Sequence, residues 1–161
     1  MTRDEFTALV RREQAGLRRL LTALCLGNSE EADDLAQETF LRAYEASARF
    51  VGEGSEQAWL RQIAWNCFLN SRRSSRPRQE TELERAERLP ADSEADAAFQ
   101  YEALYHAIRQ LSPTERTALL LHYMEDRPIA EIAQIMNVAE GTVKSALSRA
   151  RNHLKLKLSR L

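Results

Sequence analysis

The chain has 161 residues, of which 43% are hydrophobic and 29% charged, and its formal net charge is −1. These values are typical of a globular protein. Because the N-terminus is charged and no apolar run approaches about 18 residues, we expect neither a signal peptide nor a membrane span. Because only five Gly and four Pro occur and no window alternates β-branched with polar residues, we expect an all-α protein of the cytoplasm.

The first two helices are predicted within the first 50 residues. Apolar residues recur at helical spacing from Phe6 to Leu24, and Gly27 and Asn28 then form a helix stop. Ser29 precedes a second helical stretch, whose acidic residues lie at its start, where the helix dipole favours negative charge.

A third helix is predicted over residues 57–71, after a loop over residues 51–55. Its spacing assigns Trp59 to the core, whereas Trp65 fits the core and an exposed stacking platform about equally well. The helix runs into a cluster of arginines at its C-terminal end.

We expect no catalytic residue, no metal site and no cofactor. Cys25 and Cys67 lie on predicted helices without a CxxC pattern or histidines at ligand spacing, so both are assigned to the core. A metal-dependent nuclease built on Asp33, Asp34 and Glu38 is an alternative, but no histidine or second carboxylate cluster joins them.

A linker divides the chain. Residues 79–98 hold few large apolar side chains, Pro90 interrupts any helix there, and residues 79–102 contain two arginines against eight acidic residues. The predicted organisation is two small helical domains, 1–78 and 103–161, joined by this flexible acidic linker, each domain being near the lower limit for burying its own core.

The C-terminal domain begins with a short amphipathic helix around Ile108. Ser112 then serves as an N-cap, with Pro113 at the first helical position and Glu115 completing a capping box. A further helix is expected after Pro128.

A helix-turn-helix is the strongest motif of the chain. Residues 129–136 form its first helix, residues 137–139 a tight turn in which Asn137 can adopt the left-handed conformation, and a second helix starts at Glu140. The polar side chains that point outward on the second helix suit the DNA major groove, and they are Lys144, Ser145, Ser148, Arg149, Arg151, Asn152 and Lys155.

Two segments, 57–79 and 141–161, contain no acidic residue and several basic ones. Two separate basic surfaces suggest a polyanion contacted at two places, although solvated helix faces remain an alternative for each segment taken alone. The helix-turn-helix alone would also fit a free-standing repressor or activator, which predicts dimers on palindromic half-sites.

Both halves resemble one family. The run Asp33 to Tyr44 (DDLAQETFLRAY), followed by Trp59 to Asn66 (WLRQIAWN), is similar to the second domain of the extracytoplasmic-function (ECF, group IV) sigma factors of bacterial RNA polymerase. Leu111 to Arg116 (LSPTER) and the helix-turn-helix are similar to their fourth domain. The resemblance implies a non-catalytic subunit that binds core RNA polymerase and directs promoter recognition, DNA opening and transcription initiation.

The resemblance also implies roles for individual residues. The clamp coiled coil of the polymerase β′ subunit would be contacted by Asp34, Leu35, Gln37, Glu38 and Arg42. The minus-ten element would be captured by the loop 51–57 and held by Arg61, Asn66, Arg72, Arg73 and Arg76.

The outward face of the second helix-turn-helix helix would bind the minus-thirty-five element, and residues 104–123 would contact the β-subunit flap. The acidic linker would thread the RNA channel, or be simply disordered, and an anti-sigma factor is an expected partner. Two positions depart from the family pattern: Glu56 replaces a common aromatic residue, and Ala139 replaces the usual cap before the second helix, so that this helix is expected to fray.

Overall fold

A computed structural model describes residues 1–52, 54–74 and 95–158, and every regular element among them is helical, as the sequence predicts. The elements are α1 (Arg3–Leu24), α2 (Ser29–Ala46), the short 3-10 turn η1 (Ser47–Arg49), α3 (Glu56–Ser74), α5 (Ala95–Arg109), α6 (Pro113–Tyr123), α7 (Ile129–Met136) and α8 (Glu140–Leu158). Within those ranges, no helix is both long and apolar enough to cross a membrane.

Side-chain caps fix the starts of several helices. Thr2 and Glu5 form a capping box at α1, and Ser112 accepts a hydrogen bond from the backbone N–H of Glu115 at 3.1 Å, with proline at the start of α6 as predicted. At α2 the cap is Asn28, and Ser29 is already helical, so this helix begins one residue earlier than its acidic stretch suggests.

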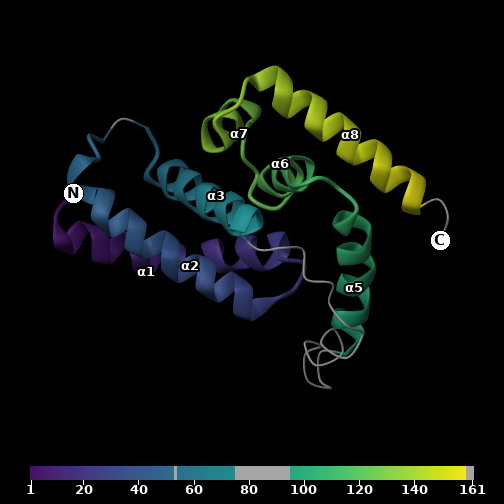
Figure 1. Cartoon of the computed structure of the whole chain (residues 1–161), viewed down its shortest axis with the longest axis horizontal. Helices are drawn as coiled ribbons and strands as arrows, with labels where there is room; N and C mark the ends of the chain where they lie inside the picture. Colours follow the sequence, from purple (N-terminus) through teal and green to yellow (C-terminus); the bar gives the residue numbers. More distant parts are fainter. Residues whose placement is uncertain (53, 75–94, 159–161) are drawn as a thin grey trace.

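The helices α1, α2 and α3 form the N-terminal module, and α5, α6, α7 and α8 the C-terminal one (Figure 1). Leu17, Leu21 and Phe68 are fully buried in the core of the first module. Cys25 and Cys67 are buried free thiols, which confirms their assignment to the core, and burial raises the pKa of Cys25 to about 12.

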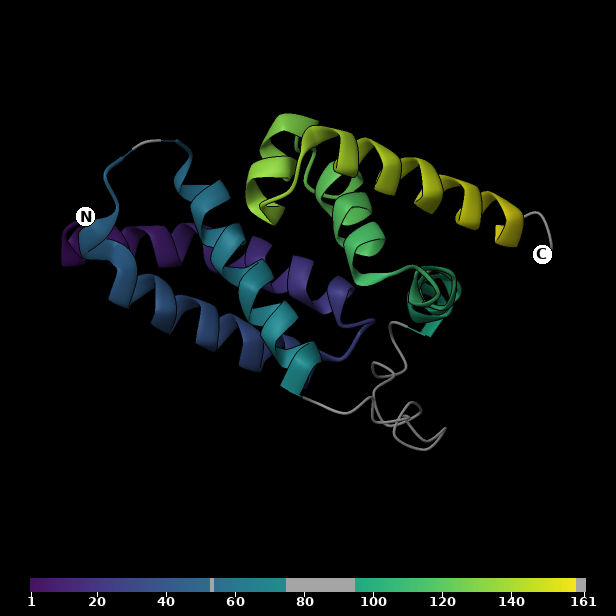
Figure 2. The same ribbon diagram turned by 45° about the horizontal axis from the view of Figure 1, so that its top comes forward.

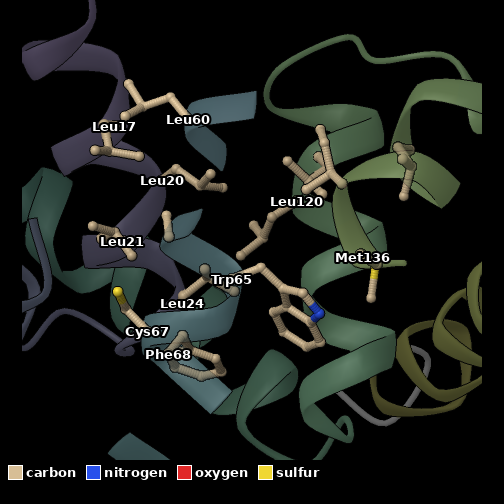
Figure 3. Packing of buried hydrophobic residues seen from close by; sticks show 14 of the residues in the cluster. Leu17, Leu20, Leu21, Leu24, Leu60, Trp65, Cys67, Phe68, Leu120 and Met136 are labelled. Atoms are coloured by element: carbon tan, nitrogen blue, oxygen red, sulfur yellow. The ribbon is translucent and has the colours of Figure 1, made fainter. Parts of the chain in front are cut away.

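The two modules lie against each other in the closed arrangement that Figures 1 and 2 show from two directions. Helix α3 packs on α7, and α1 packs on α6. Trp65 from α3, only 6% exposed, lies close to Leu120 of α6 (Figure 3), and one continuous apolar cluster contains both residues and Met136 of α7. Trp65 is therefore a core residue, and the core extends from one module into the other.

Helix α5 begins at Ala95, inside the segment that the sequence suggests as an acidic linker. The rest of that segment up to residue 94 lies outside the described residues. Ile108, near the end of α5, and Leu111, just after it, are buried against Leu119 of α6 and Ala150 of α8. Helix α5 therefore packs on α6 and α8.

Candidate nucleic-acid interface

The helix-turn-helix has the predicted geometry. Asn137 ends α7 in the left-handed conformation, with φ 54° and ψ 49°, and the backbone N–H of Val138 donates to the carbonyl of Ala133 at 3.0 Å. Val143 and Leu147 of α8 are buried against the other helices. Both the boundaries of α7 and the left-handed turn are thus confirmed.

The outward face of α8 is open to solvent. Exposure is shared by all the polar side chains predicted to face DNA, namely Lys144, Ser145, Ser148, Arg149, Arg151, Asn152 and Lys155. These side chains form one basic surface, which we call the α8 face.

Two of its arginines have partners on α6 that the sequence analysis missed. The Nε of Arg151 donates to the hydroxyl of Tyr123 at 2.5 Å, and its guanidinium lies 5.4 Å from the centre of that ring. The Nε of Arg149 lies 3.6 Å from a carboxylate oxygen of Glu115. These contacts orient both guanidinium groups without burying them.

The basic residues of α3 differ among themselves. Asn66 and Arg73 are exposed, and Arg72 pairs with Glu31 at 2.8 Å while its guanidinium lies 4.7 Å from the Phe68 ring centre. Arg76, also predicted to hold the minus-ten element, lies outside the described residues.

Arg61 is buried between the two modules. Its side chain is 4% exposed, its Nη1 donates to Glu13 of α1 at 2.7 Å, and its Nε and Nη2 donate to the two carboxylate oxygens of Glu125 at 2.7 and 2.9 Å. Burial lowers the pKa of Arg61, but the hydrogen bonds and charges of Glu125 and Glu13 outweigh it, so the pKa lies above its usual value. In this arrangement Arg61 does not face solvent.

Arg116 makes a second polar contact between the modules. It is 7% exposed, and its guanidinium donates to the carbonyl oxygens of Leu24 at the end of α1 (3.0 Å) and Ile108 of α5 (3.2 Å). Burial, followed by the charges of Arg72 and Arg109, lowers the pKa of Arg116. A buried cation here satisfies carbonyl groups at helix C-termini, where the dipole favours positive charge.

The loop before α3 turns at two glycines, Gly52 and Gly54, with φ 75° and 90°. Val51 in this loop is 85% exposed, whereas Trp59 packs on the core with its ring centre 4.8 Å from that of Phe50. The position of Trp59 confirms its assignment to the core. Glu56, which departs from the family pattern, pairs with Arg12 at 2.7 Å.

On α2, the residues suggested for polymerase binding divide into exposed and buried ones. Asp34, Gln37 and Arg42 are exposed, and Glu38 pairs with Arg42 at 2.9 Å. Leu35 is only 4% exposed and packs in the core of the N-terminal module.

Sequence reasoning missed an apolar part of the same surface. Leu41 is 66% exposed and Tyr44 54% exposed, although both are large apolar or aromatic side chains. Leu41 follows Asp34 and Gln37 by seven and four residues, so helical spacing places it on their face, a signal that was available in the sequence. We call Asp34, Gln37, Glu38, Leu41 and Arg42 the α2 face.

Two family comparisons match the two modules. Residues 9–78 match sigma-70 region 2, and residues 101–154 match sigma-70 region 4. The matched ranges contain α3 with its arginines, the whole of α7, and α8 up to residue 154.

Similar proteins match the chain over most of its length. The ECF RNA polymerase sigma factor SigM of Mycobacterium tuberculosis is 34% identical over 94% of this chain and 76% of the relative. SigW of Bacillus subtilis is 32% identical over 83% of this chain and 78% of the relative. SigE of Mycolicibacterium smegmatis is 33% identical, but the chain spans only 59% of its length.

Solved structures share the fold across both modules. The sigma factor RpoE in complex with the anti-sigma factor NepR from Bartonella quintana has a TM-score of 0.73 at 24% identity, covering 96% of this chain and 97% of the other. CnrH in complex with the cytosolic domain of CnrY has a TM-score of 0.75 at 21% identity, covering 99% and 90%. Together with the family matches and the SigM identity, the helix-turn-helix and the arginine-bearing α3 show that the chain belongs to the ECF RNA polymerase sigma factors, subunits that direct RNA polymerase to promoters.

Proposed function

We propose that this chain binds core RNA polymerase through its α2 face and reads a promoter at two places, with α3 at the minus-ten element and the α8 face at the minus-thirty-five element. It would act in the cytoplasm as a specificity subunit without catalytic residues of its own. The observation that carries the proposal is the α8 face: all seven predicted DNA-facing side chains are exposed on the second helix of a well-formed helix-turn-helix.

The α8 face fits duplex DNA in its chemistry. Arginine and lysine reach guanine acceptors or phosphates, and serine and asparagine make shorter hydrogen bonds. Tyr123 and Glu115 restrict the rotamers of Arg151 and Arg149, which lowers the conformational entropy lost on binding. Within this face we propose a base-reading role for Arg149 and a phosphate-holding role for Arg151.

Helix α3 fits a single strand. The exposed side chains of Asn66, Arg72 and Arg73 follow one another toward its C-terminal end, where they would hold backbone phosphates. The loop before α3 exposes Val51 and turns at two glycines, which allows close approach of a flipped base.

The α2 face combines charge with an exposed leucine. Interfaces gain most of their energy from a few anchor residues, which are surrounded by contacts that contribute little but exclude water. Leu41 would be that anchor, with the Glu38–Arg42 pair beside it. An anti-sigma factor is a further proposed partner, because RpoE, which shares this fold, was solved with the anti-sigma factor NepR bound.

The test is binding to core polymerase. We expect Leu41→Asp to weaken binding by at least about 2 kcal/mol, the typical size of an anchor's contribution, as measured by fluorescence anisotropy of the labelled chain. Because Leu41 is 66% exposed, the free energy of unfolding should fall by only about 1 kcal/mol, from the lower helix propensity of aspartate and its repulsion by Glu38 and Glu45.

A matched control is Val51→Asp, which places the same charge on an exposed apolar side chain of the loop before α3, where no polymerase contact is proposed. Equal effects of the two substitutions would show that α2 is not the docking surface. Failure of the unaltered chain to bind core polymerase at all would remove the proposed function itself.

A further inference from the structure

Arg61 presents two different edges to its two partners. Its Nη1 donates to Glu13 on α1, which belongs to the same module. Its Nε and Nη2 together donate to both oxygens of Glu125, in the loop between α6 and α7 of the other module. Separating the modules would therefore remove Glu125 but leave Glu13 in place.

The edge covered by Glu125 has the geometry that binds phosphate. A guanidinium offers two parallel N–H donors on this edge, and carboxylate and phosphate oxygens fit them in the same bidentate way. The two distances, 2.7 and 2.9 Å, show that Glu125 occupies both donors. Glu125 thus holds the position that a phosphate would take on Arg61.

A surface hollow lies beside Arg61. It is lined by two further arginines, Arg12 and Arg19, and by the carboxylates of Glu13 and Glu125. Gly16 also lines it, and a Cβ at that position would lie 3.3 Å from Nη2 of Arg61, so glycine leaves room for the guanidinium. Without Glu125, this face would present Arg12, Arg19 and Arg61. Glu56 would remain on Arg12 and Glu13 on Nη1 of Arg61, which leaves a net positive charge.

The closed arrangement also prevents the chain from binding the two promoter elements at the same time. Elements centred at minus ten and minus thirty-five are about 25 base pairs apart, or roughly 85 Å along B-DNA at about 3.4 Å per base pair. Here α3 packs directly on α7, and a Cβ at Gly54 would lie 3.7 Å from the amide nitrogen of Gln134. Both elements can be bound at once only after the modules separate.

We infer that Glu125 is an intramolecular competitor of nucleic acid. In the closed chain it covers the phosphate-binding edge of Arg61, and after the modules separate that edge is free to bind a phosphate of the promoter strand. The inference rests on the proposed minus-ten role of α3. Glu13 is then a positioning residue, because it holds Nη1 in both arrangements and keeps the other edge directed outward.

The test replaces Glu125 by glutamine, which keeps the shape and removes the charge. The probe is a single-stranded (dT)15 oligonucleotide, because a backbone contact does not depend on base sequence. We expect Glu125→Gln to bind this probe about tenfold more tightly, within the usual range of coupling between a conformational change and binding.

The matched control is Asp126→Asn, at the next residue. Asp126 is exposed and has φ 58°, a left-handed conformation that asparagine also tolerates, so the control removes one negative charge without touching Arg61. A second comparison adds Arg61→Ala to both the unaltered chain and Glu125→Gln. The affinity gain should vanish in that background.

Module separation is measured in the same variants by energy transfer between labels at Glu45→Cys and Gln110→Cys, both exposed positions. Cys25 and Cys67 are 4% and 1% exposed and should not react with the labels. Transfer should fall in Glu125→Gln and stay unchanged in Asp126→Asn. Should Glu125→Gln fail to fold, Glu125→Asp, whose shorter side chain loses the bidentate reach, should show the same change to a smaller extent.

Equal affinities of Glu125→Gln and Asp126→Asn would overturn the inference, as would an affinity gain that survives Arg61→Ala or occurs without a fall in transfer. These readouts need no polymerase. They therefore fail or succeed independently of the core-binding test of the proposed function.

Discussion

The two acid-free segments of the chain look alike in sequence and differ in the structure. On α8, every polar side chain predicted to face DNA is exposed, whereas on α3 the first arginine of the segment is 4% exposed and bound to two carboxylates. The reason is their place in the fold: α8 lies at one side of the molecule, while α3 lies between the other helices of its module and α7 (Figure 1). A charge pattern thus predicts the sign of a surface, but burial decides which charges are available.

The largest effect is expected from removing the buried arginine of α3, Arg61. We expect Arg61→Ala to lower the free energy of unfolding by about 3 kcal/mol, because the buried carboxylates of Glu13 and Glu125 lose their closest cation. They keep the longer ion pairs with Arg12 (3.9 Å) and Arg127 (3.6 Å). Urea denaturation followed by circular dichroism measures the loss. The exposed Arg73→Ala on the same helix is the control, and a similar loss there would show that Arg61 has no special role in the fold.

The next largest effect is expected from removing an exposed arginine of the α8 face, Arg149. We expect Arg149→Ala to weaken binding of the holoenzyme to its minus-thirty-five duplex by about 1–3 kcal/mol, the usual discrimination of a base contact. The free energy of unfolding should fall by less than about 1 kcal/mol, since the ion pair with Glu115 is 3.6 Å long and Arg149 is 56% exposed.

The role of Arg149 is measured by competition binding, in which duplexes that each carry one altered base pair compete with the original duplex for the holoenzyme. Lys155→Ala, at an exposed position further along α8, should weaken all duplexes nearly uniformly. A uniform loss in Arg149→Ala as well would place the base-reading face elsewhere.

The smallest effect concerns the N-terminal caps of α3 and α8. The hydroxyl of Ser55 accepts a hydrogen bond from the backbone N–H of Ala58 at 3.3 Å at the start of α3, but α8 is preceded by Ala139, which has no side-chain acceptor. We expect Ala139→Ser to raise the free energy of unfolding by about 1 kcal/mol and to slow amide hydrogen exchange in the first turn of α8.

Ala130→Ser, within the first turn of α7, is the control for this substitution, since it adds the same hydroxyl inside a helix. Unchanged exchange in Ala139→Ser would show that the start of α8 is already fully ordered in the free chain.

Local signals explain what could be predicted. The Ser112 cap, the left-handed Asn137 and the apolar side of α8 all depend on residues within about four positions of one another, so the sequence contains the whole cause. The same holds for Cys25 and Cys67, whose burial follows from helical spacing.

Contacts between distant residues explain what could not be predicted. Arg61 is separated by 48 residues from Glu13 and by 64 from Glu125, and no spacing rule connects them. The family resemblance implies a polymerase contact for Leu35, which is 4% exposed. Leu41 is 66% exposed, although helical patterns usually assign an apolar residue to the core. The packing of α3 on α7 likewise depends on how the whole modules fold.

The most direct test of the central claim, that two surfaces read two promoter elements, is transcription by core polymerase reconstituted with this chain. Start sites are first mapped on fragmented genomic DNA, and five base pairs, about half a helical turn, are then inserted between the two elements of a mapped promoter. We predict that initiation requires the chain and is lost on insertion, because the α3 and α8 surfaces can no longer engage both elements on the same side of the helix. Initiation that is unaffected by the insertion, or that occurs equally without the chain, would contradict the account.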